Sequence, residues 1–282
     1  MTTQLFPPLD DPALPATRDA LHAYARVLGG WLTACRLPRK HWWQGSLHPA
    51  VRGLTTGVLH GVDNAEIELD LLLGRVSVRT STGAELVEPL RGQPGAVLAE
   101  QIAGFMTANG FDEQHRPSGD AYVDRESYTA TYSPNCAQTM ARVWSSLTRA
   151  LEELRAGIRE ETSAIQLWPH HFDLSMVWLP GAKIPDRDPD SVEEAENADK
   201  QMNFGFILGD DTIPEPYFYI TAYPSPDALS TLRLPAGAVW QTEGFTGVTL
   251  TYRKLLTSDD PRGYLLDLWG RLLAAGRDHL QA

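Results

Sequence analysis

The segment 168–223 constrains the fold most strongly, because three stretches within it alternate between apolar and polar residues. Alternation with a period of two predicts β-strands whose side chains point to opposite faces of a sheet. One face is wholly apolar: Phe172, Leu174, Met176 and Trp178, then Met202, Phe204, Phe206 and Leu208, then Phe218, Ile220 and Ala222. The other face carries His171, Asp173 and Ser175, then Asn203 and Gly205, then Tyr217, Tyr219, Thr221 and Tyr223. The apolar face must be buried, and the polar face has the composition of a binding surface.

Periodicity elsewhere predicts four helices and three further groups of strands. Helices are expected over 17–36 and 94–109, from Pro134 to about residue 158, and after a cap at Ser258. Residues 65–88 predict an antiparallel meander, in which acidic and arginine side chains form a charge ladder on the solvent side. Residues 41–60 predict strands interrupted by Pro49, and residues 238–252 predict a hairpin.

The order helix, strands, helix occurs twice along the chain. It predicts an α+β fold made of two similar helix–antiparallel sheet–helix halves, 1–120 and 121–282, packed around a shared core as one compact unit. Two independent domains are the alternative, but no Gly/Ser-rich linker separates the halves.

Composition and charge exclude several classes of function. The formal net charge is −12, from 24 basic and 36 acidic residues, which argues against nucleic acid or an anionic membrane as a partner. The two cysteines, Cys35 and Cys136, lack a CxxC spacing and are expected to be buried free thiols. The N-terminus lacks the features of a signal peptide, and no apolar run reaches the length of a membrane helix. These features predict a cytoplasmic protein.

The adjacent histidines His170 and His171 suggest chemistry, but the pattern supports no named site. Adjacent residues of a regular strand point to opposite faces, so the two imidazoles should not share one metal ion, and no metal site is expected. His171, Asp173 and Ser175 have the composition of a catalytic triad without a G-x-S-x-G elbow. No glycine-rich phosphate loop is present, and no cofactor is expected.

Glu215 lies between two prolines, directly before the tyrosine-rich strand. This stiff entry either begins an edge strand or holds a carboxylate at the mouth of a pocket. The tyrosines 217, 219 and 223 behind it would form an amphipathic wall, which suits a ligand site or a dimer interface.

Four phrases of the chain resemble an uncharacterised bacterial family, number 5996 in the series of domains of unknown function. They are HPAVRGLTTG (48–57), LWPHHFDLSM (167–176), GFILGDD (205–211) and EPYFYITAYP (215–224). The resemblance covers nearly the whole chain, and the phrases F-D-L (172–174) and E-P-x-F-Y (215–219) look like its hallmarks. It implies no activity, cofactor or catalytic residue.

These observations favour a cytoplasmic protein that binds a small molecule in its C-terminal half. The expected lining is Trp168, His171, Asp173, Glu215, Tyr217 and Tyr219, with His48 and Arg52 added by the first half. If the pocket belongs to an enzyme, His171 oriented by Asp173 is the general base and Glu215 the acid. The alternatives are a homodimeric interaction or scaffold protein that pairs through the tyrosine face, and a metal-dependent hydrolase built on His171 and Asp173.

Asp173 is the residue whose surroundings can be predicted most sharply. It lies between Phe172 and Leu174, so it should be at least partly buried. A buried carboxylate is costly unless it accepts hydrogen bonds. We therefore expect donors from His171, from the backbone or from a nearby tyrosine.

Overall fold

The computed structural model describes residues 5–111, 115–117, 131–185, 187 and 198–281. It contains both helices and antiparallel sheets, so the predicted α+β class is confirmed. The chain forms two compact units. Unit 1 comprises residues 1–145 and 167–172, and unit 2 comprises residues 146–166 and 173–282. The division expected near residue 120 falls outside the described residues, and the similarity of the two halves stays a prediction.

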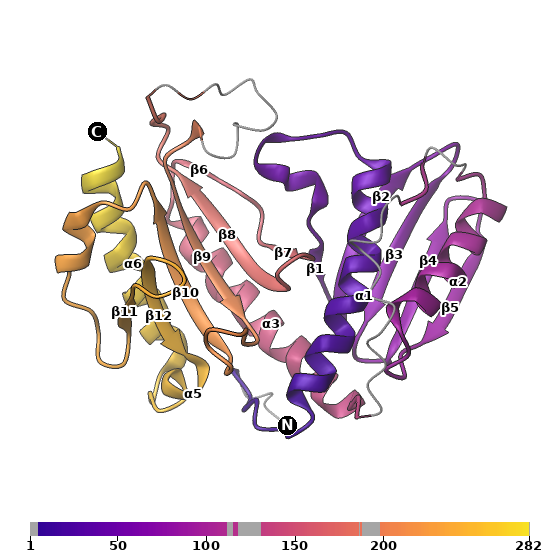
Figure 1. Cartoon of the computed structure of the whole chain (residues 1–282), viewed down its shortest axis with the longest axis horizontal. Helices are drawn as coiled ribbons and strands as arrows, with labels where there is room; N and C mark the ends of the chain where they lie inside the picture. The colour runs from indigo at the N-terminus through magenta and orange to yellow at the C-terminus, as the bar shows by residue number, and fades with distance from the viewer. Residues whose placement is uncertain (1–4, 112–114, 118–130, 186, 188–197, 282) are drawn as a thin grey trace. The chain divides into compact units, whose positions relative to one another are not determined.

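Among its described residues, unit 1 contains a five-stranded antiparallel meander, two α-helices, a short 3₁₀-helix and the first part of a third α-helix (Figure 1). Its elements are α1 (Leu14–Cys35), the 3₁₀-helix η1 (Lys40–Gly45), β1 (His48–Ala50), β2 (Gly53–His60), β3 (Asn64–Asp70), β4 (Arg75–Thr80), β5 (Glu85–Pro89) and α2 (Gly95–Ala108). The strands pair in sequence order, and the predicted meander is confirmed. α1 contacts β2 and α2.

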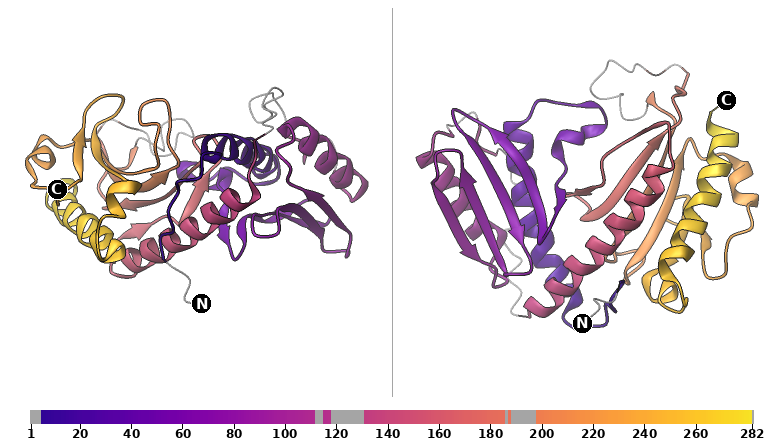
Figure 2. Two further views of the ribbon diagram at one scale, coloured as in Figure 1. Left: turned by 90° about the horizontal axis from the view of Figure 1, so that it is seen from below. Right: turned by 180° about the vertical axis from the view of Figure 1, so that it is seen from behind.

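Unit 2 is built on a second antiparallel sheet with the strand order β11-β12-β10-β9-β8-β6. After α3 (Pro134–Ala156), which begins in unit 1, come β6 (Glu161–Thr162), β7 (Gln166–Trp168), β8 (Asp173–Leu179), β9 (Gln201–Ile207), β10 (Tyr217–Tyr223), η4 (Asp227–Thr231), β11 (Val239–Gln241), β12 (Gly247–Thr251), α5 (Tyr252–Leu255) and α6 (Pro261–Leu280). Figure 2 shows α6 and the second part of α3 on the same face of this sheet.

Strand register explains why the helices cover that face. Leu174, Phe206, Phe218 and Leu250 stand opposite one another across β8, β9, β10 and β12, as do Met176, Phe204, Ile220 and Val248. All eight side chains are buried. The Phe218 ring meets Trp269 of α6 edge to face, with 6.2 Å between ring centroids. The apolar face predicted for the three strands is therefore confirmed for β8, β9 and β10.

Three local predictions were wrong. The residues His41 and Trp42 are not in a strand but in η1, where both have left-handed backbone angles. The last helix is capped by Asp260, whose carboxylate accepts from the Gly263 N–H at 2.9 Å, and not by Ser258. His171 and Phe172 precede β8 in a turn over 169–172, and Phe172 has φ 57°, so neither side chain follows the alternation of the strand.

The charged face of the meander also differs from the prediction. Asp70 is fully buried, and Glu68 is buried as well. The Asp70 Oδ2 atom lies 2.9 Å from Arg52 Nε and 3.6 Å from Arg75 Nε, while Oδ1 accepts from the Leu73 N–H at 2.9 Å. These carboxylates therefore belong to a partly buried ion network and not to a solvent-side ladder.

None of the helices in the part of the chain that the structure describes is long and apolar enough to cross a membrane.

Candidate functional site

The polar face of the unit 2 sheet centres on Asp173, at the start of β8. Its side chain is 5% exposed, and its Oδ2 atom accepts a hydrogen bond from the Tyr219 hydroxyl. The expected burial of Asp173 is confirmed, and of the donors expected from His171, the backbone or a tyrosine, the structure shows the tyrosine. The phenol crosses β9 to reach Asp173, because Tyr219 on β10 stands opposite Gly205 on β9, and Gly205 stands opposite Ser175 on β8.

Gly205 leaves the space through which the Tyr219 phenol crosses β9. A Cβ atom at position 205 would overlap with the Tyr219 ring and its hydroxyl, so the ring lies directly over the glycine. Ser175 adds a side-chain hydrogen bond to Tyr219. Any larger residue at position 205 would force the ring away from Asp173.

Electrostatics keeps the proton on the phenol. Burial, and then the charge of Asp173 and the hydrogen bond to it, raise the pKa of Tyr219 well above its usual value. Tyr219 is thus a neutral donor to the Asp173 carboxyl group at neutral pH. No other residue in β8, β9, β10 or β12 carries a charge at neutral pH.

Tyr217 belongs to a separate, structural pair. Its hydroxyl donates to Asp210 Oδ2 at 2.6 Å, and burial together with this bond raises the pKa of Tyr217. The Oδ1 atom of Asp210 accepts from the Thr212 and Ile213 N–H groups at 2.8 and 2.7 Å. Asp210 therefore closes the loop between β9 and β10, and Tyr217 secures it.

Glu215 is engaged at the surface. Its Oε1 atom lies 2.9 Å from Arg253 Nη2, and the guanidinium is largely exposed. Glu215 thus has a structural partner in Arg253, and its predicted role as a general acid stays a prediction.

His171 lies in unit 1, together with the other histidine of the turn. The turn is held by the His22 Nε2–H group, which donates to the Pro169 carbonyl at 2.9 Å, and by the Phe172 ring, which stacks on His22 and meets Trp144 edge to face. The rings of His170 and His171 lie side by side, with centroids 4.4 Å apart. The assumption that their side chains point to opposite faces was wrong, because they lie in a turn.

The remaining predicted residues also lie in unit 1. Trp168 ends β7, and His48 begins β1, where burial, followed by Arg36 and Arg39, lowers its pKa. Arg52 binds Asp70 and so has a structural partner. The prediction that these three residues share a site with Asp173 stays a prediction.

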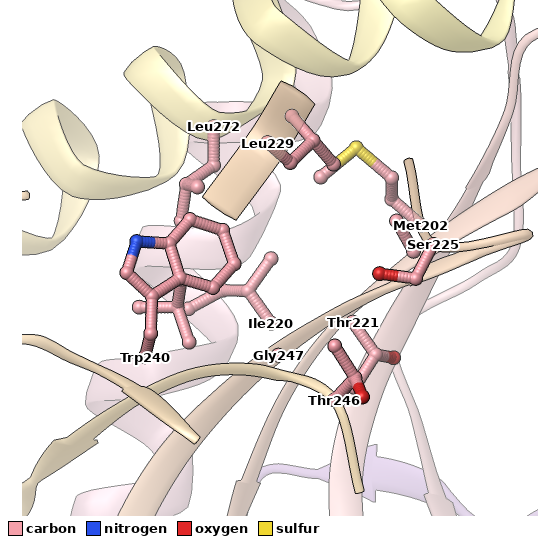
Figure 3. A pocket seen from close by; sticks show the side chains of 11 residues that line it. Met202, Ile220, Thr221, Ser225, Leu229, Trp240, Thr246, Gly247 and Leu272 are labelled. Atoms are coloured by element: carbon pink, nitrogen blue, oxygen red, sulfur yellow. The ribbon is translucent and has the colours of Figure 1, made fainter. Parts of the chain in front are cut away.

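A small hollow lies at one end of the unit 2 sheet, on its apolar side (Figure 3). It is lined by Met202, Ile220, Thr221, Ala222, Ser225, Leu229, Trp240, Thr246, Gly247, Val248 and Leu272. None of the predicted ligand residues lines this hollow. It is an extension of the core against α6 and η4, separate from the polar face.

The described side chains give little support to a metal site. Within residues 5–111, 115–117, 131–185, 187 and 198–281, no group of three or more His, Cys, Asp or Glu side chains could hold a metal ion. Cys35 and Cys136 are free thiols, and burial raises the pKa of each to about 11. Both are therefore protonated and unreactive at neutral pH.

Sequence reasoning missed the role of Gly205. The signal was a glycine between two phenylalanines in a strand, since glycine inside a strand often marks close approach of another group. The structural role of Asp210 was missed as well, although the phrase G-D-D between strands is a turn signal.

Comparison with known proteins places the chain in a family but gives it no activity. No curated protein matches the chain, and neither does any solved structure. Residues 6–280 match the family described as "Family of unknown function (DUF5996)". Because the match covers almost the full length, the chain belongs to DUF5996, a family whose function is unknown.

Proposed function

We propose that unit 2 binds a small molecule on the polar face of its sheet, through Asp173 and Tyr219. The observation that carries the proposal is a buried carboxylate bonded to a tyrosine that lies across a glycine. A buried charge is costly, and a polar group set among hydrophobic strands is often kept for function. Both residues are on strands, which hold side chains more rigidly than loops do.

The ligand class follows from charge. Asp173 is the only charged residue of β8, β9, β10 and β12, and Tyr219 and Ser175 beside it are neutral. A protonated amine complements such a surface, because the carboxylate attracts its charge and the tyrosine ring offers a π face. The proposal is therefore a site for an organic cation.

A titration with butylamine tests this function. We expect butylamine to perturb the NMR signals of strand residues around Asp173, and butanol and butyrate, which lack a positive charge, to do so far less. Asp173→Asn should weaken butylamine binding about 10-fold or more, the scale of one hydrogen bond to a charged group. Asp267→Asn, which removes the same charge from the exposed face of α6, is the matched control and should bind like the wild type.

Equal perturbation by all three compounds, or equal affinity of Asp173→Asn and wild type, would rule out the proposed site. The alternative function, a homodimer formed through the tyrosine face, has a different signature. It requires a stable dimer in sedimentation experiments that Tyr219→Asp dissociates, and no specific response to butylamine. The hydrolase alternative would need metal ligands that the described residues do not bring together.

A further inference from the structure

The negative net charge of the chain conceals a basic region in unit 1. Residues 20–62 contain none of the 36 acidic residues of the chain, yet they hold five basic ones: Arg26, Arg36, Arg39, Lys40 and Arg52. This stretch forms most of α1, then η1, β1 and β2. The net charge of the whole chain therefore does not describe the local charge of this part of unit 1.

Three elements bring basic groups together at the end of α1. The Arg36 guanidinium donates to the Thr56 carbonyl, and to the Val58 carbonyl at 3.5 Å, so it lies across the bulge in β2. Burial, and then the charges of Arg36 and Arg39, lower the pKa of His48 at the start of β1, so its imidazole is neutral at neutral pH. Arg39 and Lys40 lie three and four residues after Arg36 in the chain, and both are exposed.

Large apolar side chains are exposed in the same place. Leu37 is 85% exposed, Trp42 is 46% exposed, and Val58, whose carbonyl Arg36 binds, is half exposed. Exposed aliphatic and indole groups beside basic residues are unusual for a surface that meets only water. Together these residues, 36–40 with Trp42, His48 and Val58, define the basic–apolar patch.

The backbone adopts an unfavourable conformation at Trp42, whose side chain is exposed. His41 and Trp42 both have φ 55°, a left-handed conformation that is unfavourable for residues other than glycine. Surrounding contacts hold this shape: the Arg39 N–H donates to Gln44 Oε1 at 2.8 Å, and the Ser46 hydroxyl donates to the Trp43 carbonyl at 3.1 Å. The result buries His41 and leaves the Trp42 indole exposed.

An acidic group beside the patch is already neutralised. Glu66 stands opposite Val58 in the strand register, where it accepts from the Thr55 hydroxyl at 2.7 Å and lies 3.5 Å from Arg79. The patch therefore keeps its positive character. The positive charge of the patch is complementary to an anionic partner. Its exposed aliphatic side chains favour a partner with an apolar interior. A nucleic acid, whose surface is lined with phosphates, does not offer such an interior.

We propose that the basic–apolar patch of unit 1 docks on the surface of an anionic lipid bilayer. Arg39 and Lys40 would meet lipid phosphates, while Leu37 and Trp42 would enter the interface between headgroups and acyl chains. This attachment is peripheral and reversible, and it requires no membrane-spanning helix.

Vesicle sedimentation with the full chain tests the proposal. We expect binding to vesicles of phosphatidylcholine mixed with phosphatidylglycerol, and none to vesicles of phosphatidylcholine alone. Each basic residue near such a surface contributes about a 5-fold change in partitioning, so Arg39→Gln with Lys40→Gln should weaken binding by about 25-fold. The matched control, Arg253→Gln with Lys254→Gln, has the same net charge but alters exposed residues of unit 2, and it should bind like the wild type.

Trp42→Gly separates docking from folding. Glycine adopts φ 55° without strain, so this variant should unfold at the same or a higher temperature while its vesicle binding falls. A Trp42→Gly variant that binds vesicles normally would overturn the proposal. So would equal binding to both kinds of vesicle, no binding to either, or a preference for a single-stranded oligonucleotide over the anionic vesicles.

Discussion

Replacing Asp70 with alanine is expected to lower the free energy of unfolding by about 3 kcal/mol, the lower end of the range for removing one partner of a buried ion pair. Asp70 is fully buried, and its carboxylate serves Arg52, Arg75 and the Leu73 N–H. Its loss leaves the part-buried Leu73 N–H without this acceptor. The two arginines are about one-third exposed and can turn towards water, which places the loss below the upper limit for such pairs. Urea unfolding measures the difference.

Glu66→Ala on the same strand is the matched control. The Glu66 side chain is 38% exposed and lies 3.5 Å from Arg79, so removing it should cost less than about 1 kcal/mol, as is usual for surface pairs. If both variants lost the same stability, the Asp70 network would be no more than a surface ladder.

Gly205→Ala is the second substitution with a large expected effect. The new methyl group would overlap with the Tyr219 ring, so the phenol must leave its place over β9 and release Asp173. Overpacking of this kind costs about 1–3 kcal/mol, and part of the cost here is the lost bond to the carboxylate. Thermal and urea unfolding should both show the loss.

A second-site variant shows whether the ring causes that loss. In a Tyr219→Ala background the clash is absent, so Gly205→Ala should cost much less than it does in the wild type. Gly104→Ala is the control for the glycine change itself. Position 104 lies inside α2 with open space around it, where alanine should stabilise the helix by about 0.5–1 kcal/mol. Full additivity of the Gly205 and Tyr219 changes would refute the proposed packing.

The sequence predicted the faces of the unit 2 sheet well, because side chains in a strand alternate whatever surrounds them. It predicted that Asp173 is at least partly buried and accepts a hydrogen bond from His171, the backbone or a tyrosine, since a carboxylate between apolar neighbours requires a donor. It could not identify Tyr219 as that donor. The identity depends on two registers, Tyr219 opposite Gly205 and Gly205 opposite Ser175, and register is a property of strand pairing that alternation along a single strand does not specify.

The incorrect predictions from the sequence have a common physical cause. The composition of residues 41–43 predicts a strand, but tertiary contacts hold His41 and Trp42 in a left-handed turn. The alternation of β3 correctly predicts which residues share a face with Asp70. It does not predict that this face is buried, because burial depends on what packs there. The turn at 169–172 interrupts the strand pattern for the same reason, with Phe172 fixed by His22 and Trp144.

The central claim is that Asp173 is kept for a ligand and not for stability, and urea unfolding of Asp173→Asn tests it most directly. Asparagine keeps the shape and an oxygen acceptor for the Tyr219 hydroxyl while it removes the buried charge. If Asp173 serves a ligand site, the free energy of unfolding should stay the same or rise, because functional groups are often retained at a cost in stability. A loss of about 1–3 kcal/mol, the scale of a disturbed buried hydrogen bond, would show that the carboxylate is structural and would contradict the claim.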